Sequence, residues 1–230
     1  MKNNSILAAL LLLCGFAANA QDSKFKLGIR FAPSIAFNRA TDLDDKDTTT
    51  YSKNGAGVRF SGGLVADFYF AKNYAFYTGF WFTSTRSGLK YEKTGQGSGK
   101  AVYSLQYLQL PLAIKLFTSE IAPDTKLYFI IGTTVGWKIA EKEKEYESSL
   151  SYMKKPERNN AFVNTDFGLL LTAGAEVKLA ESTILFGGLS YNRGLNDAAS
   201  KDGIFVNHRA SGDKYTVNNT LLSLEVGVKF

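Results

Sequence analysis

Residues 105–117 read LQYLQLPLAIKLF, and leucine or isoleucine stands at every second position from 108 to 116. Successive side chains of a strand point to opposite sides, so these residues share one face, while Gln109, Pro111 and Lys115 share the other. A helix would scatter Gln109 and Lys115 among the leucines, which favours the strand. Proline removes a ladder donor, so Pro111 predicts a bulge or bend. The apolar face consists of Leu108, Leu110, Leu112, Ile114 and Leu116.

The same alternation recurs along the chain and predicts eight strands. In the third of them the facing is ambiguous, because Phe76, Phe80 and Phe82 compete with Tyr77 and Trp81 for the apolar side. The register of the seventh is also open. The predicted strands are residues 24–38, 58–70, 74–89, 105–117, 127–139, 163–179, 185–192 and 222–230.

The connections between these strands alternate between long and short. Alternate connections lie at opposite ends of an up-and-down barrel, so the pattern predicts a barrel with long loops at one end and tight turns at the other. The long polar connections are residues 39–57, 90–101, 141–160 and 196–216, and the short ones are residues 71–73, 118–126 and 180–182.

Alternation alone does not decide which face of the strands looks outward. A soluble lipocalin-like barrel would turn its apolar face inward. The separation of long and short connections, the glycines among charged residues on the polar faces and the terminal Phe230 favour a membrane barrel instead. The lumen of an eight-stranded barrel is filled by side chains, and a closed ring satisfies every backbone group in lipid. The predicted lumen network comprises Arg30, Arg59, Asp67, Lys115, Lys138, Asp166, Glu176, Arg193 and Glu225.

The first twenty residues read MKNNSILAALLLLCGFAANA. A lysine, a short apolar run and an Ala-Asn-Ala ending predict a signal peptide at 1–20, which leaves 21–230 as a single barrel domain. The apolar run is too short to span a bilayer as a helix. Cys14 is the only cysteine of the chain and lies inside this segment, so we expect no disulfide or thiol nucleophile in the mature protein.

The charged residues exclude some classes of partner. The chain has 27 Lys and Arg residues against 21 Asp and Glu, but they are dispersed, so no nucleic-acid partner is expected. The acidic run TDLDDKD at 41–47 lacks the glycine and glutamate of a calcium-binding EF-hand loop, because Asp47 and Lys53 occupy those positions. We interpret it as a solvated loop or a weak divalent-ion contact with lipopolysaccharide. No metal or cofactor is expected.

Several aromatic residues stand near the predicted strand ends, where amphipathic rings favour the headgroup level of a membrane. We expect Trp137 near the outer rim and Phe70, Tyr74 and Phe230 near the periplasmic rim. Trp81 and Tyr77 are interpreted as belonging to the same interface set.

Two further segments carry competing hypotheses. The run EKEKEYE at 141–147 alternates in charge and is expected to continue a strand beyond the membrane. Together with Tyr152 and Met153 it is a candidate partner-binding surface, and a hidden hairpin there would raise the strand count to ten. His208 is the only histidine and stands near Ser211 and Asp213, but proximity in sequence does not make a catalytic triad.

Three quoted elements resemble a known family. YLQLPLAIKLF at 107–117 resembles a strand of the outer-membrane β-barrel family abundant in Bacteroidota, to which PorT-like proteins belong. TGFWFTSTRSGLKY at 78–91 and GGLSYNRGLND at 187–197 look like its third and seventh strands. The resemblance implies a small barrel in the outer membrane, with both termini in the periplasm and long loops outside. It also implies that the terminal aromatic strand, which ends in Phe230, is read by the barrel-assembly machinery. It implies no enzymatic activity.

The sequence therefore predicts an all-β, eight-stranded antiparallel up-and-down transmembrane barrel. The expected function is structural or partner-binding and not enzymatic, with PorT-like participation in secretion as one form of it. Expected partners are outer-membrane lipid, lipopolysaccharide, the barrel-assembly machinery and a protein bound through the external loops. A narrow porin-like channel for ions or small solutes is the alternative. A lipid-modifying enzyme is a remote alternative that rests on His208.

Overall fold

The computed structural model describes residues 24–42, 49–149, 161–200 and 215–230. These residues form nine antiparallel strands, and none of them forms a helix that could cross a bilayer. The strands are β1 (Phe25–Asp42), β2 (Thr49–Lys53), β3 (Ala56–Ala71), β4 (Tyr74–Lys93), β5 (Gly97–Ala122), β6 (Thr125–Ser148), β7 (Thr165–Lys178), β8 (Ile184–Gly194) and β9 (Tyr215–Lys229).

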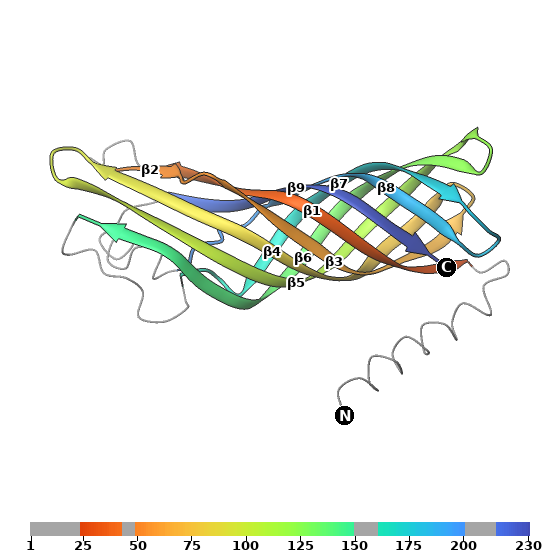
Figure 1. Cartoon of the computed structure of the whole chain (residues 1–230), viewed down its shortest axis with the longest axis horizontal. Helices are drawn as coiled ribbons and strands as arrows, with labels where there is room; N and C mark the ends of the chain where they lie inside the picture. The colour runs from red at the N-terminus through yellow and green to blue at the C-terminus, as the bar shows by residue number, and fades with distance from the viewer. Residues whose placement is uncertain (1–23, 43–48, 150–160, 201–214) are drawn as a thin grey trace, which may run out of the picture.

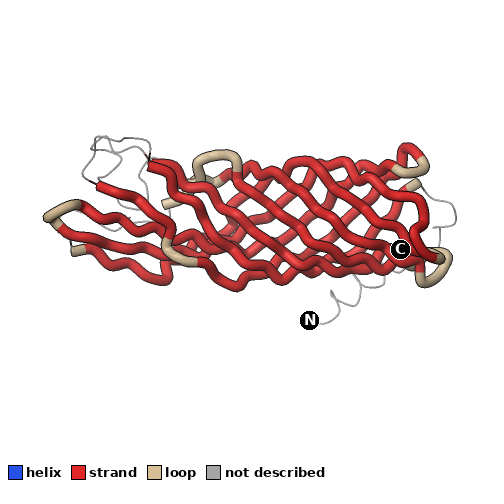
Figure 2. The backbone as a smooth tube through the Cα atoms, turned by 90° about the horizontal axis from the view of Figure 1, so that it is seen from above, coloured by secondary structure: helices blue, strands red, loops and turns tan. Residues whose placement is uncertain are grey.

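Eight of the strands close into a ring (Figures 1 and 2). Sequential neighbours pair in the order β3, β4, β5, β6, β7, β8 and β9, and β1 bridges the two ends by pairing with both β3 and β9. The short strand β2 lies outside the ring and pairs with the far part of β4. The prediction of an eight-stranded antiparallel barrel is confirmed, and the ring does not contain the ten strands of the alternative.

The two ends of the barrel differ, as the connection lengths predict. The short-turn end carries the tight connections at 72–73, 123–124 and 179–183 together with Phe230. At the opposite, extended end, β4, β5 and β6 are 20, 26 and 24 residues long and project past the rest of the ring (Figure 1). The strand continuation predicted for EKEKEYE is confirmed, because β6 runs to Ser148.

The prediction of a long loop at 90–101 is wrong. β4 runs to Lys93, β5 begins at Gly97, and only a turn at 94–96 connects them. A strand outside the membrane needs no apolar outer face, so its alternation is weak and its polar residues imitate a loop. The strand β2 escaped prediction for the same reason, since TTYSK has a single apolar side chain.

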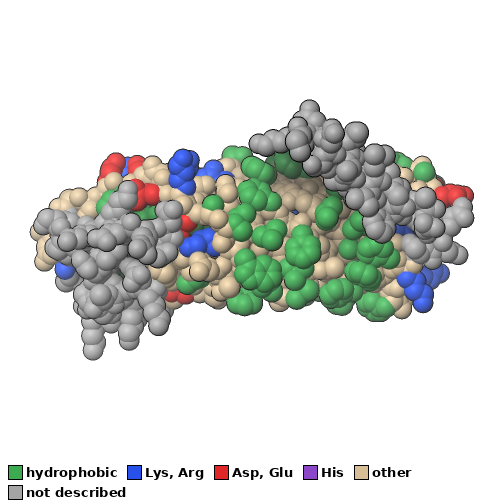
Figure 3. Space-filling view, turned by 90° about the horizontal axis from the view of Figure 1, so that it is seen from below, with side chains coloured by type: hydrophobic (Ala, Val, Ile, Leu, Met, Phe, Trp, Pro, Cys, Tyr) green, Lys and Arg blue, Asp and Glu red, His purple; other side chains and the backbone are tan. Residues whose placement is uncertain are grey.

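A belt of large apolar side chains surrounds the ring (Figure 3). Charged side chains gather beyond the belt at both ends of the visible face. A soluble protein does not expose a continuous apolar surface of this kind, so the belt is the lipid-facing surface. Each ring strand contributes to it, for example Phe31, Phe60, Phe80, Leu112, Ile131, Leu171, Leu189 and Leu224.

The inner side of the ring is polar and aromatic, which explains the polar residues of the 105–117 stretch. Gln109 and Lys115 are buried in the lumen, whereas the five predicted lipid-facing residues of this strand lie on the outer side. Of the bulge or bend expected at Pro111, the bulge is wrong, because β5 keeps its register there with both neighbouring strands. The register with β4 is the same before and after Pro111, but no β4–β5 pairs occur between Ala113 and Gln109. The backbone N–H that proline lacks therefore belongs to the β4 side of the strand.

The lipid-facing assignment predicts the response to Leu112→Arg. Leu112 lies midway between Leu108, paired with Trp137, and Leu116, paired with Tyr74. An arginine at the bilayer midplane of a barrel should lower the free energy of unfolding by about 2 to 4 kcal/mol. Urea unfolding in lipid vesicles measures this change.

The matched control is Ile121→Arg, because Ile121 is exposed at the short-turn end of the same strand. It should cost no more than about 1 kcal/mol, the range found near an interface. Equal losses at both positions would show that the belt is not the membrane surface.

Candidate functional site: the filled lumen and the extended end

A group of four charged residues, here called the lumen cluster, lies in the lumen toward the short-turn end. It consists of Asp67 of β3, Lys115 of β5, Glu176 of β7 and Lys229 of β9, all buried. Each carboxylate pairs with both lysines, and Lys115 Nζ lies 3.3 Å from Asp67 Oδ2. The charges balance, which the low dielectric of the interior requires. The cluster joins four strands across the lumen.

A second buried pair lies beside this cluster. Arg30 Nε donates to Glu225 Oε2 at 2.8 Å, and Arg30 also donates to the Ser61 hydroxyl at 3.1 Å. The Tyr128 hydroxyl donates to the other oxygen of Glu225 at 2.8 Å. The guanidinium lies 3.9 Å from the centre of the Trp81 ring, a cation–π contact. Both oxygens of Glu225 are thus satisfied inside the barrel by donors from two strands, Arg30 of β1 and Tyr128 of β6.

A third pair ties the extended end to the segment before β7. Lys138 Nζ lies 2.6 Å from Glu141 Oε2, and the other oxygen of Glu141 accepts from the Ala161 backbone N–H at 3.0 Å. Lys138 also donates to the Phe162 carbonyl. Phe162 forms a bridge with Ala199. These contacts hold Ala161 and Phe162 inside the barrel, toward the extended end.

Aromatic and aliphatic side chains form two buried groups in the described lumen, beside buried polar residues such as Gln109 and Asn219. One group surrounds the lumen cluster, and a second group, here called the extended-end core, lies under β2, β4, β5 and β6. Buried side chains therefore occupy the described lumen at both levels. The first group is Val65, Ala75, Tyr77, Trp81, Ala113, Phe117, Tyr128, Ile130, Leu170 and Phe186. The extended-end core is Tyr51, Leu89, Tyr91, Ala101, Tyr103, Leu105, Tyr107, Ala161, Phe162, Ala198, Ala199 and Val217.

The structure places most of the predicted lumen network inside the ring. Arg59 lies near its outer end, half-buried, and donates to the Thr85 carbonyl at 3.4 Å. The expectation for Arg193 is wrong, because this side chain is exposed on the outer face of β8. It shares its side of the strand with Leu189, so its alternation already indicated the outside. The residues that point inward are Arg30, Asp67, Lys115, Lys138, Asp166, Glu176 and Glu225.

Three important lumen residues were missed by sequence reasoning. Lys229 belongs to the lumen cluster. It stands on the other face of β9 from the apolar Val226 and Val228, and this alternation indicated a lumen position. Tyr128 and Trp81 are also buried in the lumen. Burial of Trp81 and Tyr77 corrects their interpretation as interface aromatics. Aromatic rings occur both at the membrane interface and in the lumen. Only the face of the strand on which a residue stands distinguishes the two locations.

The predicted rim aromatics lie on the outer surface. Trp137 is exposed on β6 toward the extended end, and Phe70, Tyr74 and Phe230 are exposed at the short-turn end. Phe70 and Tyr74 stack with ring centres 6.2 Å apart. These rings mark the two borders of the apolar belt.

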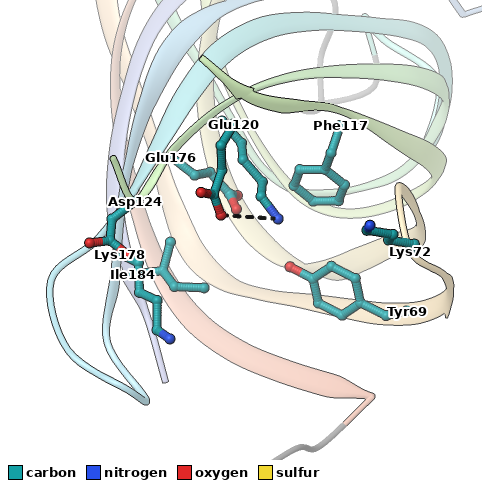
Figure 4. A pocket seen from close by; sticks show the side chains of 9 residues that line it. Tyr69, Lys72, Phe117, Glu120, Asp124, Glu176, Lys178 and Ile184 are labelled. Atoms are coloured by element: carbon teal, nitrogen blue, oxygen red, sulfur yellow. Dashed lines mark ion pairs between the residues drawn. The ribbon is translucent and has the colours of Figure 1, made fainter. Parts of the chain in front are cut away.

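A small pocket of about 120 Å³ opens at the short-turn end (Figure 4). Tyr69 and Phe117 stack along its wall with ring centres 5.5 Å apart, and Glu176 of the lumen cluster forms part of its lining. The Lys126 ammonium lies 4.0 Å from Glu120 at the mouth. Through Glu176 the pocket reaches the lumen cluster.

A wider polar groove of about 680 Å³ crosses the sheet of the extended end. Lys100 of β5 lies in it and pairs with Glu145 at 2.5 Å and with Glu147 at 3.4 Å. The Tyr91 hydroxyl shares a hydrogen bond of 2.6 Å with Ser148. Tyr146 does not line the groove but packs against the extended-end core, and this burial raises the pKa of its phenol to about 12. The groove therefore offers hydroxyls and paired charges to a hydrated ligand.

Several predicted features lie outside the described residues. They are the signal peptide at 1–20, Asp44, Asp45 and Asp47 of the acidic run, Tyr152 and Met153, and the trio of His208, Ser211 and Asp213. Among the described residues, no group of three or more potential metal ligands occurs.

Comparison with known proteins follows this geometry. Residues 19–200 match the model of the outer membrane protein beta-barrel domain family, and the chain has no match among curated proteins. OprG from Pseudomonas aeruginosa is 12% identical with a TM-score of 0.50, covering 91% of this chain and 98% of that chain. Neisserial surface protein A is 15% identical with a TM-score of 0.47, covering 90% and 98%. Identities this low show likeness of fold alone.

The lumen cluster predicts a large cost for Lys115→Met. The substitution leaves two buried carboxylates with one lysine, and breaking a buried ion pair costs about 3 to 5 kcal/mol of unfolding free energy. Adding Glu176→Gln restores the charge balance, so the double variant should regain part of this loss. Urea unfolding of the three proteins in detergent measures the coupling.

Lys100→Met is the matched control, because Lys100 is paired on the exposed surface of the extended end. It should leave the unfolding midpoint unchanged within error. A double variant less stable than Lys115→Met would contradict the charge-balance account.

Proposed function

The chain belongs to the outer membrane protein β-barrel domain family, and we propose that it acts in the outer membrane as a partner-binding protein whose binding surface is the extended end. One observation carries this proposal. β4, β5 and β6 continue past the apolar belt as an ordered sheet with a hydrophobic core of its own. A barrel that served only to cross the membrane would need neither the sheet nor that core.

The filled lumen supports binding over transport. Lys115 and Lys229 are locked between two carboxylates, and Arg30 lies against Trp81. A conducting path through the described lumen would require these pairs to separate, at the cost of leaving buried charges unpaired. The channel alternative therefore lacks a supporting observation.

The surface of the extended end suits a hydrated partner. Its groove combines hydroxyl groups of Thr50, Ser52 and Ser98 with the charges of Lys90 and Lys100. Such a surface favours a polar partner such as a protein segment or a saccharide over an acyl chain. A protein component of a secretion system, as the PorT-like sequence elements favour, is the specific partner that we propose.

The proposed orientation places the extended end outside the cell and both termini in the periplasm. Support comes from the ring, because β1 begins and β9 ends at the short-turn end. Long loops outside and short turns in the periplasm are the common arrangement of such barrels.

Surface labelling tests the orientation. A short peptide tag inserted in the turn at 94–96 should be accessible to antibody on intact cells, because this turn is the tip of the extended end. A tag in the turn at 123–124 should be accessible only after the outer membrane is permeabilised. The reverse pattern would place the groove in the periplasm.

Partner binding is tested by gentle extraction of the carboxyl-terminally tagged protein from its native membrane, followed by native sizing and mass spectrometry. We expect a companion at a fixed ratio, lost in the groove variant Lys90→Glu/Lys100→Glu. Lys72→Glu/Lys126→Glu makes the same charge change at the short-turn end and should retain it.

Two outcomes would overturn the proposal. The first is a wild-type protein that runs alone, without a companion, in native sizing. The second is a companion that is lost only from the short-turn-end variant. A lone barrel that gives discrete single-channel currents in planar bilayers would establish the transport alternative.

A further inference from the structure

Asp166 differs from the other buried charged residues that the structure describes. The lumen cluster, the Arg30–Glu225 pair and the Lys138–Glu141 pair are each balanced in charge. Asp166 is 7% exposed, and its Oδ1 atom accepts no hydrogen bond. Among the described residues, no lysine or arginine forms an ion pair with it. An uncompensated carboxylate is costly inside a barrel.

Glycines of two neighbouring strands face this carboxylate. Gly136 of β6 pairs with Asp166, and a Cβ at Gly136 would lie 3.5 Å from Cβ of Asp166 and 3.5 Å from Cγ of Gln109. A Cβ at Gly194 of β8 would lie 3.3 Å from Asp166 Oδ1. Two strands thus present glycine, with no side chain, to the same buried group.

Other unsatisfied polar groups share this region. The point that a Gly194 Cβ would occupy lies 3.3 Å from the Asn219 backbone nitrogen as well as from Asp166 Oδ1. The Asn219 side chain is 2% exposed, and neither of its polar atoms has a hydrogen-bond partner. The Tyr107 hydroxyl is also buried without a hydrogen-bond partner, and Tyr107 stands two residues before Gln109, the β5 partner of Gly136.

We propose that Asp166, with the side-chain oxygens of Asn219 and Tyr107, forms an internal binding site for a single alkali cation. Carboxylate, amide and hydroxyl oxygens are the donors that hard cations prefer. A single carboxylate balances the charge of a monovalent cation, whereas a divalent ion is usually bound by several carboxylates. The cation would sit between the lumen cluster and the extended-end core, and it would leave the described lumen electrically neutral.

The test is the heat-unfolding midpoint of the purified barrel in detergent, followed by circular dichroism. Samples contain sodium, potassium or N-methyl-D-glucamine chloride at equal ionic strength and pH, the last having a cation too large for the site. A bound cation stabilises the folded state in proportion to the logarithm of its concentration. We expect a higher midpoint in sodium or potassium chloride, rising as that salt replaces N-methyl-D-glucamine chloride.

Two variants and a control localise the effect. Asp166→Asn should abolish the dependence on the alkali cation. Gly136→Ala keeps the carboxylate and places a methyl group at ordinary contact distance, so it should fold and need a higher cation concentration for the same shift. Glu120→Gln removes an exposed carboxylate at the short-turn end and should behave like the wild type.

Equal wild-type midpoints in the three salts would overturn the proposal and indicate that Asp166 is neutralised by a proton. An alkali-cation dependence that survives in Asp166→Asn would also overturn it. If Asp166→Asn does not fold, Gly136→Ala decides: an unchanged concentration dependence would exclude this site.

Discussion

Closure of the hydrogen-bonded ring is the constraint on which the rest of the structure depends. In lipid, no water replaces a missing backbone hydrogen bond, so β1 must pair with both β3 and β9. Closing eight strands fixes a narrow lumen that side chains fill. The outward residues then become apolar and the inward ones must satisfy one another. The buried ion pairs are thus a consequence of ring size as much as of any function.

The same constraint explains what the sequence could and could not predict. Between the rims, each residue faces either lipid or lumen, so the alternation at 105–117 locates both a strand and its faces. Past Leu89 the outer face meets water, the alternation fades, and the hairpin of β4 and β5 reads as a loop. Trp81 was misplaced because an aromatic ring suits both an interface and a lumen.

The lumen contacts themselves were predictable only as a class of interaction. The alternation of polar and apolar residues placed both Lys115 and Glu176 on lumen-facing sides of their strands. Their pairing, however, depends on the stagger of β5 against β7, which no local pattern encodes. Arg193 shows the opposite case, since its own alternation with Leu189 indicated the outer surface. The strand at EKEKEYE, which forms part of the proposed binding surface, was predicted from its alternating charges, whereas the core beneath it required the fold.

The seam between β1 and β9 also governs how the barrel is made. It joins Gly28 to Lys229, the two extremes of the described chain, so the ring cannot close until the last strand has been delivered. Contacts this distant in sequence make folding slow. Meanwhile β1 presents an unpaired, strongly apolar edge, which is prone to aggregate. The chain therefore carries an exposed β1 edge until β9 has paired with it, and a product truncated before β9 would keep that open edge.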